Sequence, residues 1–130
     1  MTVSRPLVTQ AIAALSSVEG ISMKPDALVE DAALLTVAFD EEEAYKAAVV
    51  NTVKALKDIS KERVKADALS GAYRGWLSYH YQPRVAQGTP ASLRIVFKQT
   101  EDSIYVLGFG HRYIPSNIYR RLSDLRLSWA

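Results

Sequence analysis

Two arginines in the second half of the chain are spaced so that they could hold a phosphate between them. Arg94 lies in a segment that alternates apolar and basic residues, and Arg112 follows the next apolar segment, with His111 beside it. Alternation puts Arg94 and Lys98 on one strand face, and antiparallel pairing would return His111 and Arg112 toward the start of that strand. Guanidinium groups bind phosphate oxygens through parallel N–H donors. The pattern predicts an anion site for a phosphodiester, unless the arginines only solvate an exposed sheet face.

A histidine beside such arginines could carry the proton transfers of RNA cleavage. RNA cleaves when its 2′-hydroxyl attacks the neighbouring phosphate in line, which requires a base, a stabilised phosphoryl group and a proton for the leaving oxygen. His111 has an ordinary pKa near neutrality and is the predicted acid or base. Lys98 could serve instead if neighbouring cations lowered its pKa. Tyr113 and Tyr119 could stack on a base or donate a proton, although Tyr119 could equally be a packing residue.

Other catalytic chemistries find little support in the sequence. The chain has no cysteine, which excludes disulfides, thiolate metal sites and cysteine nucleophiles. It contains no glycine-rich phosphate loop and no G-x-S-x-G elbow. His80 and His111 stand 31 residues apart without a nearby carboxylate. We therefore expect neither a metal site nor any other cofactor.

Charge and aromatic content divide the chain into two unlike halves. Residues 1–67 hold 8 Lys/Arg and 11 Asp/Glu, whereas residues 68–130 hold 8 Lys/Arg, 3 Asp/Glu and ten of the twelve aromatic residues. Arginine mixed with aromatic residues is typical of surfaces that bind phosphate and stack on bases. The overall balance, 48% hydrophobic and 23% charged, is globular. No apolar run approaches the roughly 20 residues of a membrane span, and the lack of a signal core and of cysteine favours a cytoplasmic location.

The elements that would position these residues follow an α+β order. Apolar periodicity predicts helices over residues 4–19, 24–31, 41–59 and from Pro115 onward, and strands over residues 34–39, 73–81, 93–98 and 104–109. Residues 82–91 are predicted to form a loop because they contain two prolines and a glycine, and residues 99–103 a hairpin turn.

Three segments between residues 65 and 112 resemble the RelE/ParE superfamily of toxins. Residues 65–74 (KADALSGAYR) resemble the stretch that leads into the sheet in that family. Residues 93–98 (LRIVFK) and 104–112 (IYVLGFGHR) resemble its central hairpin, in which an arginine-started apolar strand, a short turn and an apolar strand precede a basic pair. Tyr119 fits the tyrosine often found near the C-terminus. The resemblance spans about residues 34–122.

The resemblance implies a fold and a division of the chain. The expected fold is RelE-like α+β, with N-terminal helices packed on a curved antiparallel sheet of about four strands and a C-terminal helix. Residues 32–130 would form this domain, and residues 1–31 an N-terminal helical extension that exceeds a typical member. The aromatic stretch 73–81 and the loop after it also depart from the compact form of the family.

The resemblance also implies an activity. RelE-like members are metal-independent endoribonucleases that cleave mRNA on the ribosome, as toxins of type II toxin–antitoxin systems. The implied partners are mRNA, the ribosome and a cognate antitoxin, without a membrane. By position, the catalytic residues would be Arg94, His111, Arg112 and Tyr119, with one more residue than usual between Arg112 and Tyr119. The RNA-binding residues would be Arg74, His80, Arg84, Lys98 and Tyr113.

Two alternatives stay open at this point. ParE-like members inhibit DNA gyrase and have no catalysis of their own, and a RelE-fold chain could also be a catalytically silent binding module. The cluster of Arg94, His111 and Arg112 favours the nuclease, because a pure inhibitor needs no acid or base beside phosphate-binding arginines.

Overall fold

The first half of the chain is mostly helical and supplies one edge strand. The structure is a computed structural model that describes residues 3–129. Helix α1 (Arg5–Ser16), strand β1 (Ile21–Met23), helix α2 (Pro25–Ala38) and helix α3 (Glu42–Ser60) follow one another. The Ser4 side chain accepts from the backbone N–H of Leu7 and caps α1, while a proline occupies the first turn of both α1 and α2.

The second half forms the rest of the sheet and a C-terminal helix. Strands β2 (Asp67–Ala68), β3 (Leu77–Tyr81), β4 (Leu93–Gln99) and β5 (Ile104–His111) precede helix α4 (Ile118–Leu125). Short 3₁₀ turns lie at Gly71–Tyr73 and Leu127–Trp129. The sheet order is β1-β5-β4-β3-β2, and the class is therefore α+β, as predicted. No helix within residues 3–129 is both long and apolar enough to cross a membrane.

Over residues 3–129 the sheet is mixed and has five strands, which corrects the expected antiparallel sheet of about four. Strand β1 runs parallel to β5, with Ile21 opposite Ile104 and Met23 opposite Val106, whereas the other neighbours are antiparallel. A strand of three residues is too short to produce an alternation signal, which is why the sequence did not indicate it. Because β1 lies in the sheet and α2 runs through residue 31, residues 3–31 pack into the same core as the rest.

The predicted strand over residues 34–39 is wrong, since α2 continues to Ala38. Ala27, Leu28, Ala32 and Leu35 recur at helical spacing and are all buried, most of them in the core beneath the sheet. Burial of this face outweighs the β-propensity of the short run Leu34–Phe39, which is a weak and context-dependent preference. The second predicted helical segment, residues 24–31, is therefore part of a longer helix of 14 residues.

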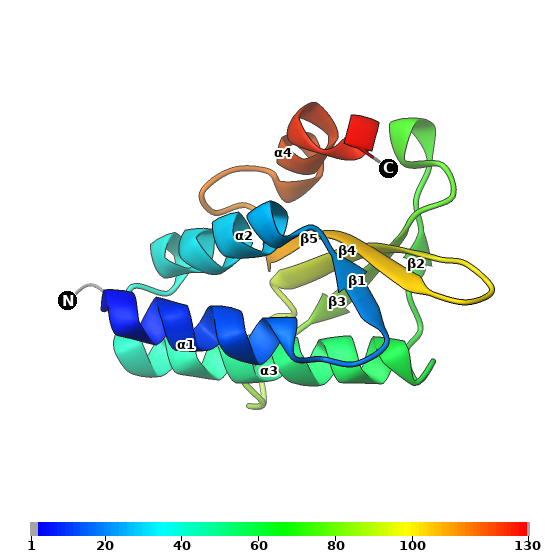
Figure 1. Ribbon diagram of the computed structural model, residues 1–130. Helices are drawn as coiled ribbons and strands as arrows, with labels where there is room; N and C mark the ends of the chain where they lie inside the picture. Colours follow the sequence, from blue (N-terminus) through cyan, green and yellow to red (C-terminus); the bar gives the residue numbers. More distant parts are fainter. Residues whose placement is uncertain (1–2, 130) are drawn as a thin grey trace.

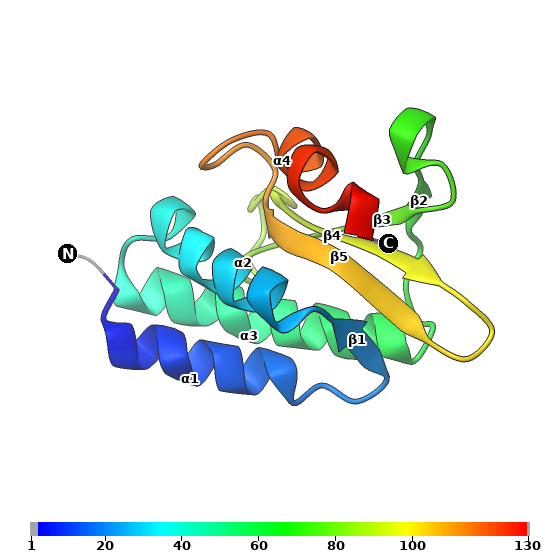
Figure 2. The ribbon, with the colours of Figure 1, turned by 45° about the horizontal axis from the view of Figure 1, so that its top comes forward.

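Two apolar cores lie on opposite faces of the sheet. Helices α1, α2 and α3 lie on one side, as Figures 1 and 2 show, and meet Leu93, Ile95 and Phe97 of β4. On the other side α4 contributes Ile118 and Leu122, which pack with residues of β4, β5 and the segment before β3. The predicted alternation of β4 is thus confirmed: its odd-numbered residues face the three helices, and its even-numbered residues share the side of α4.

Close packing of α4 against β5 depends on a glycine. A Cβ added at Gly108 would lie 2.7 Å from Nη1 of Arg126 and 2.9 Å from Cδ1 of Leu122, and closer still to Cδ2 of Leu122. Gly108→Ala should therefore lower the free energy of unfolding by about 1–3 kcal/mol, because one added methyl overpacks this contact. Urea denaturation measures the loss, and Leu122→Ala in the same chain should recover part of it. Additive losses in the double variant would contradict this packing.

Candidate phosphate-binding site

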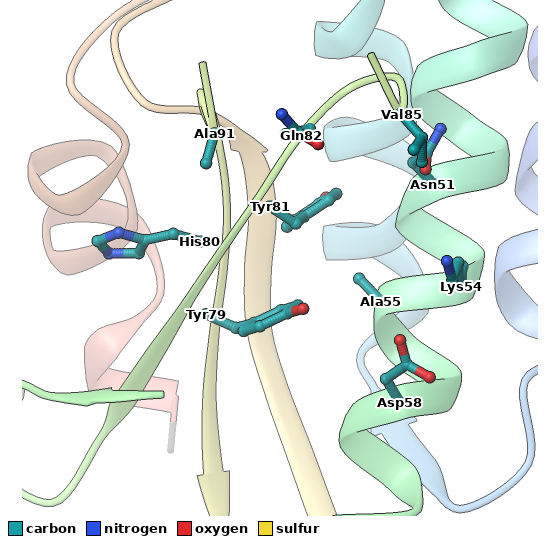
Figure 3. A pocket seen from close by; sticks show the side chains of 10 residues that line it. All are labelled: Asn51, Lys54, Ala55, Asp58, Tyr79, His80, Tyr81, Gln82, Val85 and Ala91. Atoms are coloured by element: carbon teal, nitrogen blue, oxygen red, sulfur yellow. The ribbon is translucent and has the colours of Figure 1, made fainter. Parts of the chain in front are cut away.

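The site begins with a histidine and an arginine that are paired across two strands. His80 of β3 stands opposite Arg94 of β4, and Arg94 stands opposite Gly110 of β5. Residues directly opposite in an antiparallel pair share a face, so both side chains lie on the side of α4. Figure 3 shows the same alternation along β3: Tyr79 and Tyr81 point toward α3, whereas His80 points to the other side of the strand.

Arg112 reaches the same face from the end of β5. Its backbone N–H donates to the carbonyl oxygen of Ser92 at 2.8 Å, which extends the β4–β5 ladder by one residue pair. The guanidinium lies over two tyrosine rings, 4.6 Å from the centroid of Tyr113 and 4.6 Å from that of Tyr119. Both rings hold the guanidinium by cation–π attraction.

Tyr119 is fixed in place by hydrogen bonds at both ends of the residue. Its hydroxyl lies 2.7 Å from Oγ of Ser78, which is on the same face of β3 as His80. Its backbone carbonyl accepts from the hydroxyl of Tyr73, and the two tyrosine rings meet edge to face at 6.1 Å. Asn117 caps α4 by accepting from the backbone N–H groups of Tyr119 and Arg120. The phenol is therefore a rigid member of the site.

The two arginines carry positive charge that the protein does not neutralise. Within residues 3–129, neither guanidinium is within 4.0 Å of a carboxylate oxygen. Nε of Arg94 and Nη1 of Arg112 are buried and have no hydrogen-bond partner, while Nη1 of Arg94 turns back to the carbonyl oxygens of Ala91 and Leu93. A buried donor without a partner costs about 1–3 kcal/mol. The two guanidinium groups thus keep positive charge and donor capacity that no protein group in the described residues satisfies.

His80 has the electrostatic environment of a neutral base. Its pKa is lowered by burial and by the charges of Arg94 and Arg112, against an opposing effect of Asp67. Nε2 of His80 lies 3.5 Å from Oδ2 of Asp67, which stands on the adjacent strand β2. Near neutral pH the imidazole is thus unprotonated and can accept a proton, and Asp67 can stabilise the cation that results.

His111 lies apart from this cluster, on the opposite face of the sheet. It stands opposite Leu93, whose side chain is in the core under the three helices, and its ring is 6.2 Å from that of Phe39. The cause is a one-residue bulge: Phe97 pairs with Val106 but Val96 pairs with Gly108, so Leu107 is an extra residue. A bulge moves every later side chain to the other face. The structure therefore groups Arg94, Arg112 and Tyr119 with His80, and does not place His111 with them.

The other sequence-predicted RNA-binding residues lie around the cluster or away from it. Tyr113 is 66% exposed and covers one side of Arg112. Lys98 lies on the same face as Arg94 but four residues further along β4, with Nζ 4.7 Å above the ring of Trp76. Arg74 and Arg84 are exposed on the segments before and after β3. Ser78 and Asp67 were not predicted; Ser78 is two residues from His80 and so shares its face.

A separate pocket lies on the helix side of β3. It has a volume of 250 Å³ between α3 and β3, and Asn51, Lys54, Tyr79 and Gln82 are among its lining residues (Figure 3). His80 also borders this pocket, but its ring points to the other side of β3, where the two arginines lie. Within residues 3–129 no three histidine and carboxylate side chains converge as a metal site would require.

Comparison of the chain with protein-family models, with curated proteins and with solved structures finds no match.

Proposed function

We propose that the α4 face of the sheet binds single-stranded RNA and cleaves it, and that the protein is a RelE-like toxin of a type II toxin–antitoxin system. One observation carries the proposal: two arginines flank a histidine and a fixed tyrosine, and in the described part of the chain each has a buried N–H without a partner and no carboxylate beside it. Phosphate is the anion for which paired guanidinium groups are best suited. The four-helix, five-strand arrangement is proposed to be a RelE-like fold on the sequence resemblance described above.

The four side chains can divide the reaction among them. His80 would take the proton of the 2′-hydroxyl, and the 2′-oxygen would attack the phosphorus as the bond to the 5′-oxygen breaks. Arg94 and Arg112 would hold the phosphoryl oxygens, whose charge grows in the transition state. The Tyr119 hydroxyl would protonate the departing 5′-oxygen, and its phenolate would be stabilised by Arg112 over the ring. The products are a 2′,3′-cyclic phosphate and a free 5′-hydroxyl, with no cofactor in the step.

The biological setting follows from the same resemblance. The proposed substrate is mRNA on the ribosome in the cytoplasm, and a cognate antitoxin would hold the toxin inactive. Tyr113, exposed beside Arg112, would stack on a base next to the scissile phosphate. A ParE-like gyrase inhibitor remains the alternative in which the same fold acts by binding alone.

Induced expression without a partner tests the proposal. We expect growth to stop because translation stops, with mRNA cut within codons at ribosome-bound positions. Mapping of RNA 5′-ends measures the cuts. His80→Asn is the matched variant, because it keeps a polar side chain at this exposed position but has no titratable group. Arrest with a DNA-damage response and intact mRNA would instead show the gyrase alternative. Normal growth and intact mRNA with the expressed protein would end the toxin proposal.

A further inference from the structure

The segment after β5 is held by hydrogen bonds to a single side-chain nitrogen atom. Nδ1 of His111 accepts hydrogen bonds from the backbone N–H groups of Tyr113, at 3.0 Å, and of Ile114, at 3.1 Å. The carbonyl oxygen of Arg112 then accepts from the N–H of Ile118 at 3.0 Å and closes the segment onto the start of α4. Two donors that would otherwise face solvent at a loop tip are thus satisfied by one imidazole.

The segment so folded displays two apolar side chains beside the cationic cluster. Tyr113 is 66% exposed and Ile114 is 41% exposed. The guanidinium of Arg112 lies 4.6 Å from the centroid of the Tyr113 ring. The orientation of that ring therefore depends on the backbone that His111 holds. A ring kept in one orientation binds a nucleobase better than a mobile ring, because less conformational entropy is lost on binding.

We propose that His111 is a positioning residue for RNA binding: it fixes the backbone of Tyr113 and Ile114 so that the Tyr113 ring forms a stacking site for the unpaired base next to the phosphate held by Arg112. This inference rests on the proposed function for its ligand, but the hydrogen bonds on which it depends can be measured without RNA. It assigns His111 no proton transfer, in contrast to the role predicted from the sequence.

The surroundings of His111 keep its imidazole neutral, which leaves Nδ1 free to accept hydrogen bonds. An imidazole accepts through Nδ1 only when that nitrogen is unprotonated. Burial and the charge of Arg94 lower the pKa of His111. The aromatic ring that faces it, Phe39 at the end of α2, carries no charge that would favour the imidazolium. His111 is therefore neutral near pH 7, with its proton on Nε2.

The first test detects the hydrogen bonds directly in the full chain without ligand. Nitrogen-15 NMR should show scalar coupling between Nδ1 of His111 and the backbone nitrogens of Tyr113 and Ile114, together with an Nε2-protonated imidazole. A protonated Nδ1, or the absence of both couplings in a folded sample, would overturn the positioning role whether or not the protein binds RNA.

The second test separates positioning from acid–base chemistry by a conservative replacement. His111→Asn keeps an acceptor oxygen at the same number of bonds from the backbone as Nδ1 but has no titratable group, whereas His111→Ala has neither. The probe is a short oligoadenylate with 2′-deoxyribose, which cannot be cleaved, and ordinary oligoadenylate gives the cleavage rate. Tyr113→Ala should weaken binding of the deoxy probe by about 5- to 100-fold, since one base–aromatic stack is lost.

We expect His111→Ala to weaken binding in the same way and His111→Asn to bind and cleave nearly as the unaltered protein does. The double variant with Tyr113→Ala should bind no more weakly than Tyr113→Ala alone, because His111 acts through that ring. If both His111 variants bind normally but fail to cleave, His111 is an acid or base and the inference is wrong. If the unaltered protein binds no RNA while the couplings are present, the proposed function fails and His111 is only a structural support of the loop.

Discussion

Arg112→Ala should lower the rate of RNA cleavage by about 100- to 1,000-fold, which is the usual loss when one preorganised donor to a developing oxyanion is removed. The guanidinium of Arg112 contacts both the exposed Tyr113 and the fixed Tyr119, and it also has a buried N–H without a partner. Arg94 cannot take over the role of Arg112, because Nη1 of Arg94 already donates to the carbonyl oxygens of residues 91 and 93. The measurement is the single-turnover rate on ordinary oligoadenylate.

The loss of activity should occur in a folded protein. Arg112 makes no ion pair within residues 3–129, and its removal also removes a buried donor that has no partner. What it loses in stability is attraction to two tyrosine rings, about 0.5–1 kcal/mol for each. Urea denaturation should therefore give a free energy of unfolding near that of the unaltered chain.

Three further measurements distinguish the specific role of Arg112 from its charge alone. Arg112→Lys keeps the charge but not the planar stack, and should recover only part of the rate. Arg120→Ala removes the same charge from an exposed position of α4 and should have little effect. Arg112→Ala should also raise the pKa of His80, because the guanidinium charge lowers it. Equal losses of cleavage rate in Arg112→Ala and Arg120→Ala would show that only the general positive charge of the surface matters.

The hairpin of the site could be predicted from the sequence because it follows simple alternation. The residues of β4 face the sides that the pattern Leu93–Lys98 predicts, and the turn before Ile104 lies where polar residues predict it. Arg94 and Arg112 do lie on one face, as expected, but for Arg112 alternation alone does not give this result. That prediction succeeded for Arg112 only through two steps that the sequence does not reveal: the bulge at Leu107 and the extension of the ladder to Ser92.

The same bulge explains why His111 was placed wrongly relative to the arginines. Without Leu107 as an extra residue, alternation from Ile104 would put His111 on the α4 face and Arg112 on the other. The bulge lies where Gly108 lets Leu122 of α4 approach the backbone of β5, so its position is set by packing between elements that are distant in sequence. Single-strand periodicity contains no information on such a contact.

His80 shows a different limit of sequence reasoning. Its strand carries aromatic residues on one face, and the sequence assigns it only a general role in RNA binding. Its position opposite Arg94 depends on the register between β3 and β4, which are joined by the loop at residues 82–92. A long loop does not fix the register of the strands that it joins, whereas a tight hairpin turn does. The acid–base candidate could therefore be found only from the strand pairing.

A second cluster of charges, away from the site, holds α2, β5 and the C-terminal segment together. Asp31 of α2 is fully buried and accepts from the backbone N–H of Phe109 at 2.9 Å. Its two carboxylate oxygens also accept hydrogen bonds from both terminal nitrogens of Arg126, each at 2.7 Å, and from Nη1 of Arg121 at 2.7 Å. Burial alone would lower the pKa of Arg126, but the hydrogen bonds and charges of Asp31 and Glu30 raise it. The cluster neutralises a guanidinium that is only 1% exposed.

Asp31→Ala should lower the free energy of unfolding by about 3–5 kcal/mol, because it leaves the charge of Arg126 buried without its main partner. That is a large share of the 5–15 kcal/mol of an ordinary domain, on the order of a third. Urea denaturation followed by circular dichroism measures it, and loss of α4 docking should appear first. Glu30→Gln is the matched control: Glu30 is 47% exposed, so its loss should cost about 1 kcal/mol or less.

The double variant Asp31→Leu with Arg126→Met identifies the source of the loss. If the penalty comes from an uncompensated buried charge, removing both partners should recover most of the stability, since apolar replacements of a buried pair are often neutral. If it comes instead from the lost contact to Phe109, the double variant should be as unstable as Asp31→Ala. A loss below about 1 kcal/mol in Asp31→Ala would mean that water reaches Arg126, and the buried cluster would not be what holds the C-terminal segment on the sheet.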